Sequence, residues 1–321
     1  MGRKLRVEYP GAIYHLMNRG DRREAIFRED ADREGFLAAL GEVCGKTGWQ
    51  VHALCLMPNH FHLVVETPQA NLVAGMKWLL GSYTGRFNRR HKLFGHLFSG
   101  RYKALVVDGS GTGYLKTVCD YVHLNPARAG RLETPERLRA YRWSSWPEYL
   151  KRPNRRWPWL RVDRLLGEWG VRQDSAAGRS HLEREFESSR AGEAAGDYRK
   201  LRRGWFLGPA TFKRELLGLM RERLEAEHYG EERQETAEAQ AEALVAAELK
   251  RRRWAPAELE RRAKGHPAKV ALAARLRMET TVPVSWIAER LRMGSRGYVN
   301  LLLYRRRKSK NRKSKYANIK N

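Results

Sequence analysis

Two histidines separated by a single apolar residue stand in residues 58–66, PNHFHLVVE. In a β-strand, residues i and i+2 point to the same face, so His60 and His62 are expected side by side. The alternate positions would face the opposite side and pack in a core: Phe61, Leu63 and Val65. Two imidazoles on one strand can chelate a divalent cation. A strand can also carry two histidines with no ligand role, so the pair alone leaves both interpretations open.

Alternating histidines also occur in histidine-triad nucleotide hydrolases, which offer a competing enzyme interpretation. That chemistry needs a third histidine two positions after His62, and this position holds Val64. The segment therefore does not support a histidine-triad hydrolase.

A second polar pair lies in residues 114–126, YLKTVCDYVHLNP. Tyr121 and Asn125 are four residues apart, so in a helix they lie on one face, away from an apolar stripe of Leu115, Val118 and Val122. Pro126 disfavours helical geometry at Asn125, which predicts a helix end there. A tyrosine hydroxyl is a weak nucleophile near neutral pH, and a cation beside a phosphate favours its reactive phenolate form. A single helical tyrosine is usually a packing residue, and the nearby histidine pair is what favours a catalytic role.

Residues 1–150 carry the patterns that would position these side chains. Alternation predicts strands over 13–17, 49–56 and 60–66, and helical spacing predicts helices over 30–46, 72–87 and 114–125. The short break at Pro58 and Asn59 suggests that the last two strands form a hairpin. We therefore predict an α+β domain with an antiparallel sheet and covering helices.

The composition narrows the partners. Sixty-three Lys and Arg against 36 Asp and Glu give a net charge of +27, which favours nucleic acid, although ribosomal association, a membrane-surface role or solubility alone would also fit. No apolar run is long enough for a transmembrane helix, and no secretory signal is visible, so no membrane partner is expected. Three widely spaced cysteines indicate reduced thiols in a cytoplasmic protein and argue against a cysteine zinc site.

The remaining chain differs in character from the first 150 residues. Residues 151–210 begin with KRPNRRWPWLR and are expected to be a linker or arm, and residues 211–265 a charged helical region. Residues 266–304 predict a helix-turn-helix, with a turn at 293–295 and a recognition helix from Arg296 to Tyr304. A generic helical hairpin is the alternative, and Arg292 stands where such turns commonly have glycine. Residues 305–321 are basic and expected to be disordered.

Several ordered motifs in residues 5–150 resemble the single-tyrosine HUH transposases, and within them the group associated with repetitive extragenic palindromes. The motifs are PGAIYHLMNRG (10–20), LMPNHFHLVVETP (56–68), GRYKALVVDG (100–109), YVHLNPARAG (121–130) and YRWSS (141–145). The resemblance implies a ferredoxin- or RRM-like HUH endonuclease fold over 1–150. It also implies a transposase that cuts and rejoins single-stranded or hairpin DNA through a 5′-phosphotyrosine.

Residue by residue, the resemblance implies that His60, His62 and Asn125 bind Mg²⁺ or Mn²⁺ and that Tyr121 is the nucleophile. Asn125 stands where a glutamine would be the usual third ligand. Further residues are candidates for DNA contact: Asn18, Arg19, Arg101, Lys103 and Arg128 in the motifs, and Arg296 in the C-terminal module, which would bind flanking duplex DNA.

A second function from a different class stays open: a non-catalytic or domesticated regulator that binds DNA or RNA on the same fold. The complete set of His60, His62, Tyr121 and Asn125 argues against it. The target sequence, autonomous transposition, the oligomeric state (a homodimer among the options) and the use of Tyr121 in its own or a partner subunit stay open. For a DNA-cutting enzyme without a membrane segment, the expected location is the cytoplasm, at the nucleoid.

Overall fold

The computed structural model describes the backbone of residues 6–132, 136–191, 198, 201, 204–225 and 231–317. It describes the side chains of these residues except at 191 and in 221–225, 231–237 and 309–317. The chain divides into two compact units, residues 1–226 and 227–321. Among the described residues, no helix is both long and apolar enough to cross a membrane.

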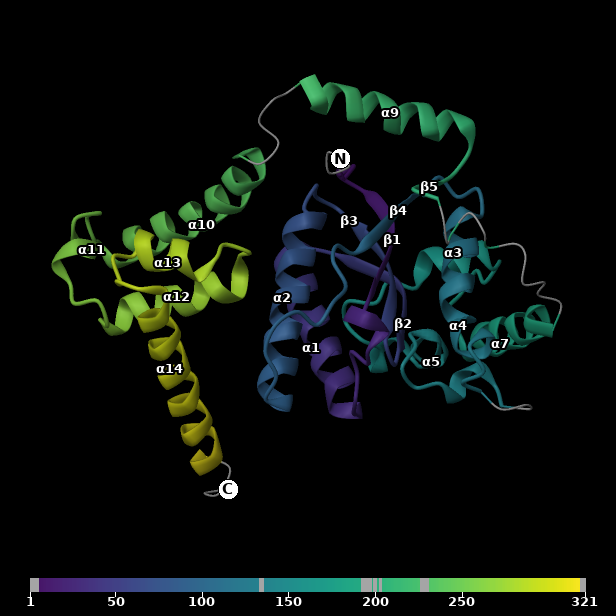
Figure 1. Cartoon of the computed structure of the whole chain (residues 1–321), viewed down its shortest axis with the longest axis horizontal. Helices are drawn as coiled ribbons and strands as arrows, with labels where there is room; N and C mark the ends of the chain where they lie inside the picture. The colour runs from purple at the N-terminus through teal and green to yellow at the C-terminus, as the bar shows by residue number, and fades with distance from the viewer. Residues whose placement is uncertain are drawn as a thin grey trace. The chain divides into compact units, whose positions relative to one another are not determined.

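A five-stranded sheet forms the centre of the first unit (Figure 1). Its strands, in spatial order, are β2 (Gln50–Met57), β3 (His60–Thr67), β1 (Ala12–Arg19), β4 (Lys103–Val107) and β5 (Phe206–Leu207). The pairs β2–β3, β1–β3 and β1–β4 are antiparallel, which confirms the predicted α+β class and the predicted hairpin. The two-residue β5 lies parallel to β4 and was not predicted.

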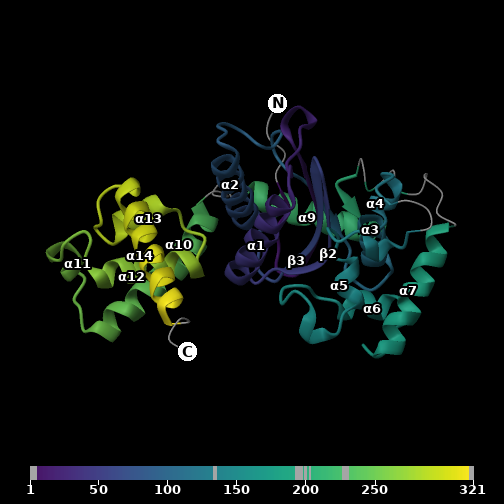
Figure 2. The same cartoon turned by 90° about the horizontal axis from the view of Figure 1, so that it is seen from below.

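Helices cover both faces of the sheet (Figures 1 and 2). One face packs against α1 (Asp30–Thr47) and α2 (Leu72–His91). The other packs against α3 (Tyr114–His123), α5 (Trp146–Leu150), α6 (Asp163–Glu168) and α7 (Ala176–Ala191). Shorter elements and α9 complete the unit: α4 (Asn125–Arg128), α9 (Ala210–Glu225) and the 3₁₀ turns Asp21–Arg23, Leu138–Ala140 and Pro153–Arg155.

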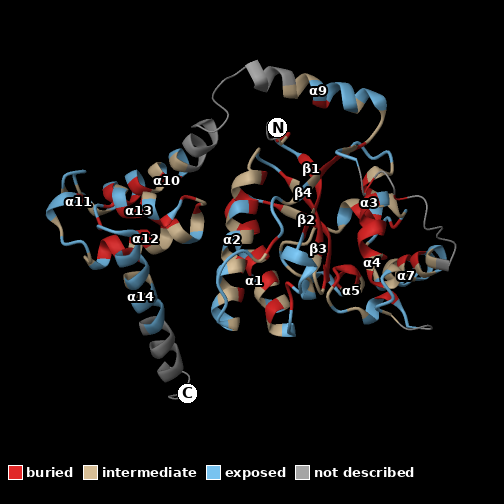
Figure 3. Ribbon diagram, in the orientation of Figure 1, coloured by how far each residue is buried: buried red, intermediate tan, exposed pale blue. Residues whose placement is uncertain are grey.

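The strand alternation explains this division into two faces. Tyr14 and Leu16 of β1 are buried on the α1–α2 side, whereas Ile13 is buried on the α3 side. Phe61, Leu63 and Val65 of β3 are also on the α1–α2 side, as predicted. Figure 3 shows buried residues on both sides of the strands and on the helix surfaces that face them. The odd-numbered positions of β3 therefore face α1 and α2, whereas its even-numbered positions, which include both histidines, face α3.

Residues 151–210, expected to be a linker or arm, are instead part of the first unit. Leu165, Leu166 and Phe186 are buried in the core on the α3 side, together with Leu207 of β5. The backbone of 159–161 pairs with Val51 of β2. The segment opens with an Arg- and Pro-rich stretch, but the apolar residues that follow this stretch anchor the segment to the core.

The second unit consists of helices around a separate core. The helices are α10 (Glu231–Arg252), α11 (Glu258–Arg261), α12 (Pro267–Glu279), α13 (Val284–Arg290) and α14 (Arg296–Ala317). Val245 of α10 packs with Leu276, Ile287 and Val299 of the last three helices. The charged region expected over 211–265 is therefore divided: α9 belongs to the first unit, and α10 packs with the predicted helix-turn-helix segment.

The turn between α13 and α14 is formed without glycine at its first left-handed position. Arg292 has a φ of 50° and Gly294 a φ of 87°. The buried Lys269 ammonium donates to the carbonyls of Arg292 at 3.1 Å, Leu259 at 2.8 Å and Arg262 at 3.1 Å. Three carbonyl acceptors satisfy this buried cation and tie the turn to α11 and α12. The predicted turn position and the helices around it agree with the structure.

The helix α14 is longer than predicted. A recognition helix was expected to end at Tyr304 and a disordered tail to begin at residue 305, but the helix continues to Ala317. Lys and Arg are good helix formers, so a basic sequence without Pro or Gly can extend a helix that packing has already nucleated.

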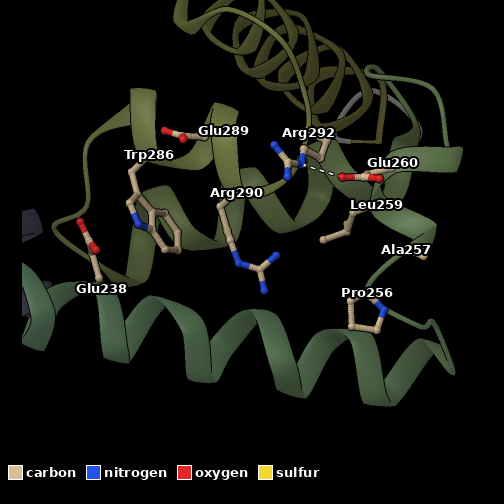
Figure 4. A pocket seen from close by; sticks show the side chains of 9 residues that line it. All are labelled: Glu238, Pro256, Ala257, Leu259, Glu260, Trp286, Glu289, Arg290 and Arg292. Atoms are coloured by element: carbon tan, nitrogen blue, oxygen red, sulfur yellow. Dashed lines mark ion pairs between the residues drawn. The ribbon is translucent and has the colours of Figure 1, made fainter.

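A cavity of about 780 Å³ opens on the second unit between α10, α11 and α13 (Figure 4). Trp286 and Arg290 point from α13 toward α10, where the Arg290 Nη2 donates to Glu242 Oε2 at 2.9 Å. The Arg292 Nε lies 3.2 Å from Glu260 Oε1. These ion pairs link α13 and the turn that follows it to α10 and α11, so Arg290 and Arg292 stabilise the packing of the second unit.

Candidate active site

A cavity of about 440 Å³ lies on the α3 side of the sheet, between the strands and the helices α3 and α4. The predicted site residues that line it are Arg19, His60, His62, Lys103, Tyr121, Asn125 and Arg128. The histidine strand and the tyrosine helix, which are far apart in sequence, therefore meet at one place. This convergence depends on α3 packing across β2, β3 and β4.

His60 and His62 are the first and third residues of β3 and project from the same face of the strand, as the alternation predicts. Their ring centroids are 5.1 Å apart. The Nδ1 of His60 lies 2.7 Å from Asn59 Oδ1. An amide oxygen only accepts hydrogen bonds, so His60 carries its proton on Nδ1 and keeps a lone pair on Nε2. Such an arrangement leaves the Nε2 lone pair free to bind a metal.

A third histidine, His15 of β1, belongs to the same group and was not predicted. Its Nε2 lies 2.9 Å from Nδ1 of His62. The register pairs Met17 with His62, which places His15 diagonally across from His62 on the same face. The only sequence signal was its position in the alternating strand 13–17, and that signal has meaning only once β1 is known to pair with β3.

Tyr121 lies on α3 with its ring against the histidines. Its centroid is 5.5 Å from that of His62 and 5.7 Å from that of His15, with edge-to-face geometry in both cases. Only 7% of Tyr121 is exposed. The helix ends at His123, and Asn125 opens the short α4, with Pro126 as its second residue. Pro126 was expected to end the tyrosine helix at Asn125, but α3 already ends at His123 and Asn125 is the first residue of α4. Pro126 lies in the first turn of this following helix, where the missing N–H of proline is tolerated.

Cations surround this group of rings. The Arg128 guanidinium lies 4.8 Å from the Tyr121 ring centroid, and its Nη1 donates to the Tyr121 carbonyl at 3.2 Å. The same guanidinium lies 4.2 Å from the ring of Tyr198. Arg19 and Lys103 line the mouth of the cavity and are exposed. A phosphate placed here would meet positive charge from two strands, β1 and β4, and from the helix α4.

Burial keeps the histidines neutral. It lowers the pKa of His60 to about 4, with a further contribution from the charge of Arg19. Burial, followed by the charges of His15, His60, Arg128 and Arg19, lowers the pKa of His62 well below its usual value. A neutral imidazole is the form that binds metal, so both side chains are in the ligand form near neutral pH.

The donor set suits a cation that retains some of its water. Among the described residues, no group of three or more His, Cys, Asp or Glu side chains is placed to hold a metal ion. A cation in the cavity would therefore rely on the two imidazoles and on the amide oxygen of Asn125. Nitrogen and oxygen donors without thiolate fit Mn²⁺ or Mg²⁺ better than a structural zinc site.

Three of the predicted DNA-contact residues lie outside the cavity. Asn18 is only 4% exposed, and its Oδ1 accepts from the backbone N–H of Arg19 at 2.9 Å. The predicted contact between Asn18 and DNA is therefore wrong for this conformation. The alternation of β1 places it on the α1–α2 side. Arg101 is exposed before the start of β4 and does not line the cavity. Arg296 is exposed in the second unit, at the start of α14.

His123, on the same helix as Tyr121, has a structural role that can be tested. It is fully buried, its Nε2 lies 2.9 Å from Ser145 Oγ, and burial lowers its pKa to about 3. Folded His123 thus stays neutral, while the unfolded chain takes up a proton near pH 6.5. The free energy of unfolding should therefore fall as the pH drops below about 6.5, by at most about 1.4 kcal/mol per pH unit from this residue.

Urea denaturation between pH 7.5 and 4.5 checks this prediction. His123→Gln should show a shallower pH dependence than wild type, because the variant lacks one such proton. An equal slope in both proteins would contradict it.

Comparisons with known proteins give one family match and two weak structural similarities. Residues 8–125 match the family of IS200-like transposases. Among curated proteins, none matches the chain. A solved structure of a REP-associated tyrosine transposase bound to a REP hairpin is 14% identical, covers 45% of this chain and 82% of its own, and gives a TM-score of 0.37.

A crystal structure from Deinococcus radiodurans R1, described as a candidate transposase, is 22% identical. It covers 38% of this chain and 95% of its own, with a TM-score of 0.28. Both structural similarities are weak, and the assignment rests on the sequence match. That match spans β1 to Asn125 and so contains His60, His62 and Tyr121. Residues 8–125, which include β1 to β4, are therefore similar to the IS200-like transposases.

Proposed function

We propose that the chain is a transposase that cuts and rejoins single-stranded DNA through a 5′-phosphotyrosine formed on Tyr121, with a divalent metal bound by His60, His62 and Asn125. The observation that carries this proposal is the convergence of these four side chains in one cavity with Arg19, Lys103 and Arg128. A solvated surface tyrosine would not need two neutral imidazoles and a guanidinium beside it.

In the cleavage step, the Tyr121 Oη attacks the phosphorus of a phosphodiester. A bond forms between Oη and phosphorus, the bond from phosphorus to the 3′-oxygen breaks, and the proton lost from the phenol is balanced by one taken up at the 3′-oxygen. The bound cation would neutralise charge on the non-bridging oxygens. Arg128, stacked on the Tyr121 ring, is placed to hold the same phosphate.

Rejoining is the reverse of this step with a different strand. A 3′-hydroxyl attacks the phosphotyrosine, a new phosphodiester forms, and Tyr121 is released with its proton restored. Because the phosphotyrosine preserves the energy of the phosphodiester, no nucleotide cofactor is needed. The packing of Tyr121 between His15, His62 and Arg128 would fix the phenol for both directions of the reaction.

Hairpin DNA is the substrate that the sequence motifs favour. The motifs that contain Tyr14 to Gly20, His60 to Glu66 and Tyr121 to Gly130 resemble those of the REP-associated tyrosine transposases. We place the chain in that group and propose that it binds a folded single strand, with the cut phosphate in the cavity.

A trapping assay tests the proposal. The full chain is incubated with fluorescent single-stranded hairpins whose stems and flanks are randomised, with Mn²⁺, Mg²⁺ or EDTA. The expected result is a metal-dependent, detergent-stable protein–DNA adduct that maps to the peptide containing Tyr121. Binding without any adduct under all metal conditions would instead support the non-catalytic regulator.

We also propose that the second unit binds duplex DNA beside the hairpin. Along α14, the residues Arg296, Asn300, Tyr304 and Lys308 follow at intervals of four and are all exposed, whereas Val299 is buried in the core. A helix with one packed face and one polar, basic face, held by a turn from a preceding helix, is suited to a DNA groove.

Neutralising two basic residues of this face should weaken duplex binding in a salt-dependent way. The double variant Arg296→Ala, Lys308→Ala is expected to reduce the slope of log affinity against log salt by about two, because about one counterion is released for each phosphate contact. Fluorescence anisotropy of the full chain with duplex DNA measures this slope. Arg261→Ala, at an exposed position of α11, is the matched control and should leave the slope unchanged. An unchanged slope in the double variant would remove α14 from the interface.

A further inference from the structure

Three aromatic rings on the α3 side of the sheet contact one another: His15, His62 and Tyr121. Their centroids are separated by 5.2 Å for His15 and His62, 5.5 Å for His62 and Tyr121, and 5.7 Å for His15 and Tyr121. The two imidazoles are stacked, with 17° between their planes. His15 is thus the one member of this triangle for which the reaction proposed above requires no direct contact with DNA or metal.

The hydrogen bond between the two histidines constrains where their protons lie. The Nε2 of His15 and the Nδ1 of His62 are 2.9 Å apart, so one nitrogen donates and the other accepts. If His62 is to offer the lone pair of Nε2 to a cation, its own proton must lie on Nδ1. In that case Nδ1 of His62 donates, Nε2 of His15 accepts, and His15 carries its proton on Nδ1.

His60, the second proposed histidine ligand, also has its Nδ1 in a hydrogen bond, but with a different partner. The Nδ1 of His60 donates to Asn59 Oδ1 at 2.7 Å. Both side chains would then present Nε2, each with Nδ1 held by a neighbouring acceptor. The two acceptors come from different places: Asn59 is adjacent in the chain, whereas His15 reaches His62 from the neighbouring strand β1.

We infer that His15 is a positioning residue that fixes the tautomer and ring orientation of His62 for metal binding, and that it holds Tyr121 against the same ring. This inference rests on the proposed metal site. His15 lines the same cavity, and in this role it acts through His62 by accepting a hydrogen bond and through Tyr121 by edge-to-face packing, with no contact to the cation or the DNA required of it. Groups that orient a ligand histidine typically change metal affinity by about 10- to 100-fold when they are removed.

Two substitutions separate this role from simple packing. His15→Gln places an amide oxygen near the position of the imidazole Nε2 and keeps an acceptor for His62. His15→Leu fills a similar volume without an acceptor. If His15 only filled space, the leucine variant would bind metal as well as the glutamine variant or better, because an apolar side chain suits a site that is 95% shielded from solvent.

The first measurement is Mn²⁺ binding to the full chain without DNA, followed by the electron paramagnetic resonance signal of free Mn²⁺. We expect His15→Leu to bind Mn²⁺ about 10- to 100-fold more weakly than wild type. The Mn²⁺ affinity of His15→Gln should lie within about threefold of wild type, because the glutamine retains the hydrogen bond that orients His62. Thermal unfolding of each variant accompanies the titration.

The matched control is His123→Leu. His123 is also a fully buried histidine with one hydrogen bond to a side chain, to Ser145, and it does not line the cavity. Its variant should lose thermal stability and keep the wild-type Mn²⁺ affinity. Equal loss of affinity in His123→Leu and His15→Leu would show a general effect of destabilisation and overturn the inference.

A second measurement needs no substitution. Long-range ¹H–¹⁵N correlation spectra of the histidine rings in the wild-type chain report which nitrogen carries the proton, and His62 should be protonated on Nδ1. A proton on Nε2 of His62 would overturn the inference even if His15→Leu fails to fold. Failure of the wild type to bind Mn²⁺ is a different outcome, because it removes the metal site itself and with it the proposed function.

Discussion

Tyr121→Phe is expected to abolish the covalent protein–DNA adduct and to lower strand cleavage by about 10³-fold or more, the scale on which removal of an enzymatic nucleophile acts. The substitution deletes only the Oη atom. The ring contacts with His15, His62 and Arg128 do not involve that atom, so the cavity and its charges should be retained. DNA binding should therefore remain close to that of wild type.

Two assays on the same hairpin DNA measure these quantities: denaturing gels for the adduct and fluorescence anisotropy for binding. Tyr114→Phe is the matched control, since Tyr114 begins the same helix and does not line the cavity. An adduct formed by Tyr121→Phe at the wild-type rate would exclude Tyr121 as the nucleophile. Loss of both binding and cleavage would mean that the hydroxyl has a structural role.

The local parts of the site follow directly from sequence periodicity. The i, i+2 spacing places His60 and His62 on one face of β3, and the i, i+4 spacing with Pro126 places Asn125 one turn after Tyr121. These relations depend on residues within a few positions of one another. They could be predicted because strand and helix geometry alone decide them.

The missing parts depend on contacts that are distant in sequence. His15 joins the site only because β1 lies between β3 and β4, and strand order is not encoded in the alternation of a single strand. Asn18 has a polar side chain in a motif, yet its parity in β1 directs it to the α1–α2 side. Composition predicted an arm for 151–210 because an Arg- and Pro-rich start is typical of linkers. Composition does not show which apolar residues of the segment are buried against the sheet domain.

The length of α14 also could not be predicted from composition. High positive charge predicted a disordered tail, but the helix is nucleated by the packing of Val299 in the core of the second unit and then propagates into the basic segment. Charge density describes how a segment interacts with water and partners, whereas a neighbouring packed turn decides whether it starts as a helix.

His62→Ala should have the second largest effect, because it removes a proposed metal ligand that is buried at the centre of the site. The Mn²⁺ affinity is expected to fall by about 100-fold or more, since one of two imidazole ligands is lost together with the group that His15 orients. Cleavage at low Mn²⁺ should fall in parallel, and raising Mn²⁺ should recover part of it. His181→Ala is the matched control, because His181 is half-exposed on α7 and lies outside the cavity.

The pH dependence of Mn²⁺ binding gives the same site an independent test. Protons compete with metal for His60 only near its lowered pKa of about 4, so wild-type affinity should change little between pH 8 and about 5 and should weaken as the pH falls further. An unperturbed imidazole would instead lose affinity from about pH 6.5 downward. In His62→Ala, the neighbouring ring that helps exclude water from His60 is gone, so the onset should move to higher pH. An onset near pH 6.5 in wild type would show that the histidines are solvated and that the buried metal site drawn from their geometry is wrong. An onset below pH 5 that moves upward in His62→Ala would tie the low proton affinity of the site to the contact between the two rings.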